Sequence, residues 1–217
     1  MDTEWAPEIG EGRNGIEARH PPGPAASAFC LRSARCLLSH AAPRLSCSGR
    51  SALPIVTAAH RCRESLGELD RLSDVFLSNP VANRASRAQG RALLTSVARS
   101  FRGRDVETLE TRIRIEGLAG HYAPLFGGLF RVLGIEMADT QRAYLFISAR
   151  GVSSAAVRLG IIGAFEAQAM QAELTAHIDA IVRDCGDLSP DDIAQTAPLI
   201  DLFQATQDRL YSRLFQS

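Results

Sequence analysis

The stretch FEAQAMQAELTAHIDAIV, residues 165–182, indicates most clearly how this chain folds. Its large aliphatic side chains are Met170, Leu174, Ile178, Ile181 and Val182. A spacing of three or four residues places such side chains on one face of an α-helix, with the polar residues on the other face. The stretch therefore predicts a long amphipathic helix that packs against other helices through its aliphatic face.

The same helical period recurs along the chain from Ser51 onward, and no stretch alternates with period two for long enough to predict a strand. Further helices are predicted over residues 52–77, 80–101, 123–133, 140–159 and 199–210, with a short element after Ser189. We predict an all-α fold in which about six or seven helices form one bundle-like domain over residues 51–217.

Local signals mark several helix ends. Asn79 before Pro80 is typical of a helix start, and Gly134 is a natural C-terminal residue for the helix before it. The helix after Gly134 can be capped by Asp139 or Thr140. By contrast, the charged stretch 102–115 shows no clear apolar face, so we predict a loop or a short irregular helix there.

Residues 1–50 differ in composition from the rest of the chain. They hold five of the ten prolines and three of the five cysteines, and no acidic residue occurs between Ala18 and Arg63. We predict a disordered leader that does not pack, as a mispredicted gene start would give. An organelle transit peptide is the alternative, because such peptides are rich in Arg and Ser and poor in acids.

Composition excludes several classes of function. The formal net charge is zero, which gives no bulk attraction to nucleic acid or to an anionic membrane. All 24 basic residues are Arg, so no mechanism that needs a lysine is available. No apolar run approaches the roughly 20 residues that span a bilayer. The protein is therefore predicted to be soluble. The five cysteines show no CxxC spacing, so we predict no disulfide framework and a cytoplasmic location.

The sequence carries no motif for catalysis or for a cofactor. It lacks the P-loop, dinucleotide, HExxH and GxSxG patterns, and we predict no enzyme activity, no cofactor and no metal site. His121 and Tyr122 in GHYAPLFG are interpreted as a structured turn at a helix start rather than a catalytic pair. Cys185, beside a group of aspartates, is not expected to be a reactive thiol.

Two arginines stand out in the helical segment ARGVSSAAVRLGIIG. Arg150 and Arg158 interrupt small residues that permit close helix packing. We predict either a core helix with two arginines at its edge or a surface that faces a partner. Arg158 in an apolar run is expected to have a buried acceptor, such as Glu166 or a carbonyl.

The last residues are apolar where a chain end is normally polar. Tyr211, Leu214 and Phe215 fall on one face of a helix, and Arg213 points elsewhere. We expect this segment to dock on its own domain or on a partner, because aromatic residues with arginine are typical of interfaces.

Four ordered stretches resemble the UreF family of urease accessory proteins, in particular its eukaryotic members. They are ELDRLSDVFLSNPVANRASRAQGRALL (68–94), GHYAPLFG (120–127), SARGVSSAAVRLGIIG (148–163) and TAPLIDLFQATQDRLYSRLFQS (196–217). The resemblance covers residues 51–217 and implies an all-α protein that dimerises. It also implies a scaffold that binds UreD (also called UreH), recruits the GTPase UreG and helps to insert nickel into apo-urease.

Carried onto this sequence, the resemblance implies that the tail from Gln207 to the end orders against UreD and that Arg213 helps to recruit UreG. The helical segment with which family members normally start, a pattern like LPxGxF, is replaced by the leader. A truncated, non-functional product of this kind is therefore one alternative. A helical adaptor unrelated to urease and a helical enzyme with an unrecognised site are the others.

Overall fold

The computed structural model describes residues 39, 41–101, 103–195 and 206. Its helices are α2 (Leu53–Arg61), α3 (Leu66–Phe76), α4 (Pro80–Ser100), α5 (Arg104–Ile115), α6 (Tyr122–Val132), α7 (Met137–Arg158) and α8 (Ala164–Cys185), followed by the 3-10 turn η1 (Pro190–Asp192). The described residues contain no strand, and the predicted all-α fold is confirmed. None of the described helices is both long enough and apolar enough to cross a membrane.

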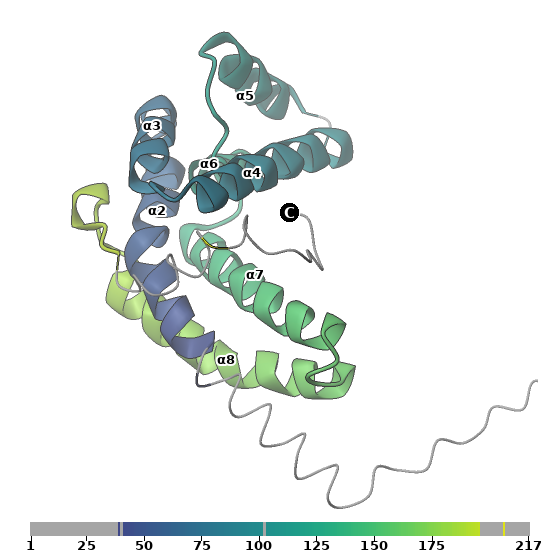
Figure 1. The fold of residues 1–217 in the computed structure, drawn as a ribbon. Helices are drawn as coiled ribbons and strands as arrows, with labels where there is room; N and C mark the ends of the chain where they lie inside the picture. The colour runs from purple at the N-terminus through teal and green to yellow at the C-terminus, as the bar shows by residue number, and fades with distance from the viewer. Residues whose placement is uncertain (1–38, 40, 102, 196–205, 207–217) are drawn as a thin grey trace, which may run out of the picture.

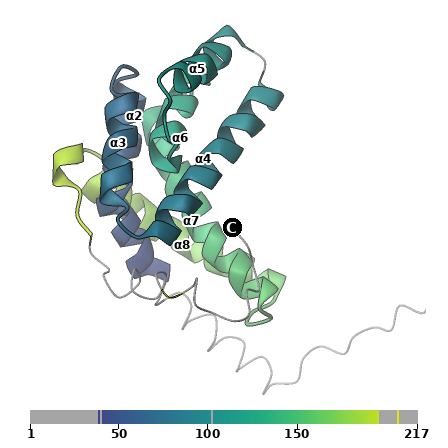
Figure 2. The same cartoon turned by 45° about the horizontal axis from the view of Figure 1, so that its top comes forward.

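Helix α6 lies at the centre of the bundle, in contact with α2, α3, α4 and α5 (Figures 1 and 2). Every residue from Ala123 to Leu129 is buried, and Phe126 is fully enclosed. The sequence of α6 is apolar on all sides, which is typical of a helix surrounded by others. Its aromatic rings continue the core, since Phe126 stacks on Phe130 at a centroid distance of 4.0 Å.

Two glycines allow α6 and the turn before it to approach neighbouring helices. A Cβ atom on Gly127 would lie 2.2 Å from the backbone oxygen of Val56 in α2. A Cβ atom on Gly90 in α4 would lie 2.1 Å from the backbone oxygen of Gly120. Since no side chain fits at these distances, glycine sets how closely α2 and α4 can pack on this part of the core.

Helices α7 and α8 form an antiparallel pair, and both views show them side by side (Figures 1 and 2). The aliphatic face predicted for residues 165–182 is buried at Met170, Leu174, Ile178 and Ile181, which confirms that prediction. Buried polar contacts also join this pair to the core. The Gln141 side-chain amide in α7 donates to the Thr57 hydroxyl in α2 and to the Gly186 carbonyl after α8.

Several helix ends match their sequence signals. The Asn79 side chain accepts the Val81 N–H at 2.9 Å, so Asn79 caps α4 as predicted. Gly134, just after α6, has a φ of +74°, the left-handed conformation that favours glycine. Ser189 caps η1 through a reciprocal pair of hydrogen bonds with Asp192.

Three boundaries differ from the prediction. The single helix predicted over residues 52–77 is broken at residues 62–65 into α2 and α3. The helix after α6 begins at Met137, with Glu136 rather than Asp139 or Thr140 at its cap position. The charged stretch 102–115 contains the regular 12-residue helix α5, so the predicted loop is wrong there. Its apolar face consists of only Val106, Leu109 and Ile113, which are buried among many charged residues.

The predicted boundary of the leader is also wrong. Residues 41–51 are helical, and Ala41 and Leu45 are buried in the main core. The same helix packs closely on α8, because a Cβ atom on Gly49 would lie 2.4 Å from Ile181 Cγ2. An apolar face of two residues beside a proline gave too weak a period to detect. The remainder of the predicted leader apart from Ser39, and the predicted helix 199–210 apart from Thr206, lie outside the described residues.

Candidate partner-binding surface

A groove between α7 and α8 brings together the two arginines that the sequence singles out. Its volume is about 600 Å³. It is lined by Phe146, Arg150, Ser153, Ser154, Val157, Arg158, Ala164, Ala167, Gln168 and Gln171. Residues 146, 150, 154 and 158 are four apart, so they form one ridge along α7. Both arginines are exposed on α7, whose opposite face is buried at Leu145 and Ala149, and binding of a partner by the exposed face stays a prediction.

The floor of the groove is polar and internally hydrogen-bonded. Ser153 and Gln171 are 4% and 8% exposed. The Ser153 hydroxyl donates to Gln171 Oε1 at 3.2 Å, and Gln171 Nε2 donates to the Phe146 carbonyl at 3.3 Å. Because these side-chain groups are satisfied, they fix the separation of α7 and α8 at this point.

Arg158 lies at the surface, and the acceptor expected for it stays a prediction. The Arg158 side chain is exposed, near the C-terminal end of α7, and Arg150 is exposed as well. An exposed guanidinium keeps much of its hydration. The cationic end of α7 also suits the helix dipole at that terminus.

Asp70 shapes the turn that precedes α6. This carboxylate of α3 is 3% exposed and accepts the backbone N–H groups of Ala119 (2.7 Å), Gly120 (3.1 Å) and His121 (2.8 Å). Three consecutive amides converge on one buried charge. The interpretation of GHYAPLFG as a structured turn at a helix start is confirmed, with Asp70 as the organising residue that the sequence did not indicate.

His121 joins three elements through its ring. Nε2 lies 3.1 Å from Asp74 Oδ1 of α3, and Nδ1 lies 3.2 Å from Ser86 Oγ of α4. A carboxylate only accepts hydrogen bonds, so Nε2 donates to Asp74, and in the neutral ring Nδ1 then accepts from Ser86. The Ser86 oxygen in turn accepts the Tyr122 N–H at 3.1 Å. These hydrogen bonds tie α3, α4 and the start of α6 together.

Asp74 is held as a carboxylate by its neighbours. Hydrogen bonds from Arg87, then Asn83, then His121 lower the pKa of Asp74 well below its usual range. The carboxylate is partly exposed, and the Arg87 contact is an ion pair across α3 and α4. Sequence reasoning missed this cluster, because its members come from three separate helical segments.

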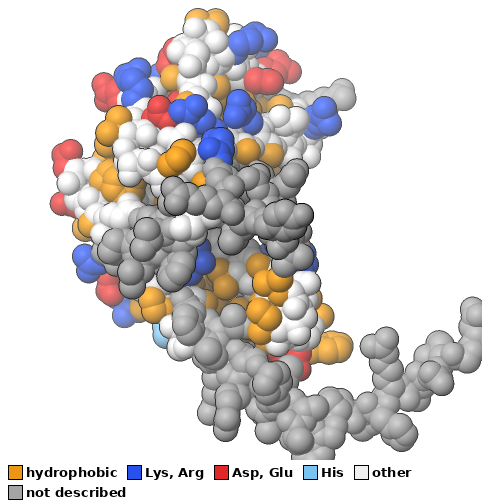
Figure 3. Space-filling view, in the orientation of Figure 1, with side chains coloured by type: hydrophobic (Ala, Val, Ile, Leu, Met, Phe, Trp, Pro, Cys, Tyr) orange, Lys and Arg blue, Asp and Glu red, His pale blue; other side chains and the backbone are white. Residues whose placement is uncertain are grey.

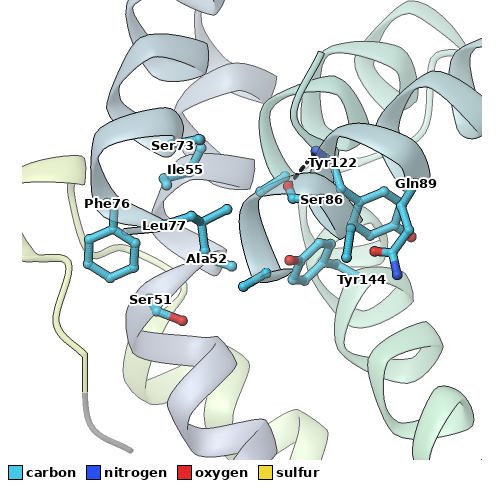
Figure 4. A pocket seen from close by; sticks show the side chains of 13 residues that line it. Ser51, Ala52, Ile55, Ser73, Phe76, Leu77, Ser86, Gln89, Tyr122 and Tyr144 are labelled. Carbon is cyan, nitrogen blue, oxygen red and sulfur yellow. Dashed lines mark hydrogen bonds between the residues drawn. The ribbon is translucent and has the colours of Figure 1, made fainter. Parts of the chain in front are cut away.

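A second, smaller pocket adjoins the His121 turn (Figure 4). Its volume is about 260 Å³, and it lies among α2, α3, α4, α6 and α7. The labelled Tyr122 and Tyr144 side chains lie on one side of it, with Ser86 and Gln89 of α4 beside them (Figure 4). Burial raises the pKa of Tyr122 to about 12 and raises that of Tyr144 further, so both phenols stay neutral near pH 7. The pocket is lined by uncharged side chains, of which Phe76, Tyr122 and Tyr144 are aromatic.

The remaining predicted residues have the following places. Burial raises the pKa of the Cys185 thiol, in agreement with the prediction that it is not reactive. Across the described ranges, no group of three His, Cys, Asp or Glu side chains is arranged to hold a metal ion. The predicted tail residues Gln207, Tyr211, Arg213, Leu214 and Phe215 lie outside the described residues.

Fold and surface together define an all-helical domain that carries an arginine-bearing groove. The sequence model of the UreF family matches residues 44–175, more than half of the chain. This range runs from the helical residues before α2 into α8. The chain therefore belongs to the UreF family.

Curated relatives carry related names. Urease accessory protein F of Oryza sativa subsp. indica is 33% identical over 174 residues, which cover 77% of this chain and 66% of the relative. Urease accessory protein F of Arabidopsis thaliana is 33% identical over 171 residues, 76% of this chain and 70% of the relative. A UreF-like protein of Schizosaccharomyces pombe is 28% identical over 177 residues, 76% and 74% of the two chains. The chain thus spans just under two thirds of the rice relative.

Proposed function

We propose that this chain is a non-enzymatic urease accessory protein that acts as an assembly scaffold. In this role it binds UreD (UreH), recruits the GTPase UreG and supports nickel insertion into apo-urease in the cytoplasm. The observation that carries the proposal is the match of the UreF family to residues 44–175, which include most of the buried core. The relatives in rice and Arabidopsis that share this region are named urease accessory proteins.

The chemistry of the described residues agrees with a scaffold. Ser86, His121 and Asp74 have the residue types of a catalytic triad. Their hydrogen bonds connect α3, α4 and the start of α6. The arginine-bearing groove, by contrast, presents Arg150 and Arg158 on the exposed side of α7. These features support the proposal of a binding role.

Two regions would make the contacts. The tail residues Gln207, Tyr211, Leu214 and Phe215 would bind UreD, and Arg213 would help to recruit UreG. Arg150 and Arg158 would face a further partner surface. We also propose that two copies of the chain form a homodimer within the complex.

Reconstitution tests this function. Apo-urease, UreD, UreG, GTP and Ni²⁺ are combined with or without the purified full chain, and urease activity is measured. Activity should rise only when the chain is present, and UreD should be retained on the immobilised chain. The chain alone should hydrolyse neither GTP nor urea. Failure to bind UreD and to raise urease activity would refute the proposal.

The tail provides a finer test. Deletion of residues 211–217 should abolish UreD binding while the circular-dichroism spectrum stays nearly unchanged. Arg213→Ala should keep UreD binding but weaken UreG recruitment, since truncation of an interface arginine costs about 2 kcal/mol or more. If the deletion unfolds the domain, the tail is a core element and not a docking element. If Arg213→Ala recruits UreG normally, the role of this residue is wrong.

A further inference from the structure

The groove between α7 and α8 carries charge of one sign only. Arg150 and Arg158 are its charged lining residues, and all of its other lining side chains are neutral. The two arginines are eight residues apart in one helix, which corresponds to roughly 12 Å along the axis at 1.5 Å per residue. Both are exposed at the groove and can meet a partner's side chains.

Apolar side chains stand at both ends of this ridge. Phe146, one turn before Arg150, is 40% exposed. Beyond Arg158, at the turn into α8, Leu159, Ile161 and Phe165 are 47%, 43% and 91% exposed. Figure 3 shows hydrophobic side chains gathered over this end of α7 and the turn. Aromatic and aliphatic groups beside arginine have the composition of a protein interface.

The floor of the groove is formed by uncharged, hydrogen-bonded side chains. The Ser153 hydroxyl donates to Gln171 Oε1, and Gln171 Nε2 donates to the Phe146 carbonyl. These groups need no ligand, so recognition rests on the two arginines and on the apolar ends. Ala164 and Ala167, on the α8 side of the groove, are small. They leave room for a helix of a partner to lie in the groove beside α7.

We propose that this groove binds an acidic amphipathic helix of another protein in the urease assembly complex. The helix carries two carboxylates about two turns apart, which pair with Arg150 and Arg158, and apolar residues that cover Phe146 and Phe165. This inference rests on the proposed function and specifies the partner chemistry of the groove. Two copies related by a two-fold axis would set arginines against arginines, which disfavours self-association through this face. The apolar ends favour a protein over a nucleic-acid phosphate backbone.

Charge reversal is the first test. The probes are UreD, UreG and apo-urease. Each is titrated against the immobilised full chain alone, and then against the full chain already bound to the other two proteins. Arg150→Glu and Arg158→Glu should each weaken the binding of one of these proteins about tenfold or more, which is what loss of an interface arginine implies. Arg150→Lys should retain more affinity than Arg150→Glu. Arg104→Glu, at an exposed position of α5 outside the groove, is the matched control and should stay within about twofold of the wild-type chain.

A photo-cross-linking residue in place of Ser154, which lines the groove and is exposed, identifies the occupant in the assembled complex. The expected product is a partner peptide with Asp or Glu residues seven or eight positions apart. Cross-links to a second copy of the chain, or to a peptide without that pattern, would overturn the inference. The same holds if the Glu variants bind as tightly as the Arg104→Glu control.

The two proposals fail in different ways. If the wild-type chain binds none of the three proteins, the proposed function and this inference both fail. If the wild-type chain binds and activates urease but the groove variants behave like the control, only the inference fails. Circular dichroism and the free energy of unfolding of each variant show whether a loss of binding comes from loss of the fold.

Discussion

Replacement of Asp70 by alanine should destabilise the domain more than any single surface change. The Asp70 carboxylate accepts three backbone N–H groups, from Ala119, Gly120 and His121, at 2.7–3.1 Å. Gly120 and His121 are buried, whereas Ala119 is half-buried and can be hydrated. The substitution therefore removes the acceptor of two buried amides.

The magnitude follows from these two amides. A buried donor that loses its partner costs about 1–3 kcal/mol, so the expected loss is roughly 3–5 kcal/mol once the charge of the lost acceptor is included. This is a large share of the roughly 5–15 kcal/mol that stabilises a typical domain. For a chain of this size it corresponds to a decrease in Tm of roughly 6–20 °C. Asp70→Asn should cost less, because its amide oxygen can still accept one N–H.

The assay is urea unfolding of the full chain, followed by circular dichroism at pH 7. Asp187→Ala is the matched control, since Asp187 is an exposed carboxylate (97%) in an ion pair with Arg61. That variant should lie within about 0.5 kcal/mol of the wild type. If Asp70→Ala unfolds at the same urea concentration as Asp187→Ala, the three hydrogen bonds do not hold the turn and the reasoning is refuted.

Two further predictions concern packing and pH. Gly127→Ala places a Cβ atom against the Val56 backbone oxygen and should destabilise by about 1–3 kcal/mol, whereas Gly151→Ala meets nothing within 4 Å and should stabilise α7 by about 0.5–1 kcal/mol. Equal unfolding midpoints for the two variants would contradict this. The pKa of Asp74 is lower in the folded state than in the unfolded state. The ionised carboxylate therefore stabilises the fold at pH values above the unfolded pKa of about 3.9, and this stabilisation is progressively lost as the pH falls below about 4. The deficit of Asp74→Asn relative to wild type should therefore shrink between pH 7 and pH 3 in urea unfolding, and a constant deficit would count against the role of Asp74.

Local features of the sequence determined the helices. The aliphatic spacing from Met170 to Ile181 predicts the face of α8 that is buried, and Asn79 with Pro80 predicts where α4 begins. These signals act within one or two turns of backbone, so they can be read without knowing the rest of the fold. Where the apolar face is small, as in α5 and in residues 41–51, the same method failed, because packing against other helices stabilises those segments.

Tertiary structure alone decided the sites. Asp70 lies about fifty residues before the amides it binds, and no local pattern links an aspartate in one helix to the turn before another. The sequence singled out Arg150 and Arg158, but the groove exists only because α8 folds back along α7 and brings Gln171 against Ser153. Helix formation depends on neighbouring residues, whereas the position of each side chain in a site depends on how whole helices pack. That packing is set by contacts far apart in the chain, including glycines such as Gly90 and Gly127 that permit close approach.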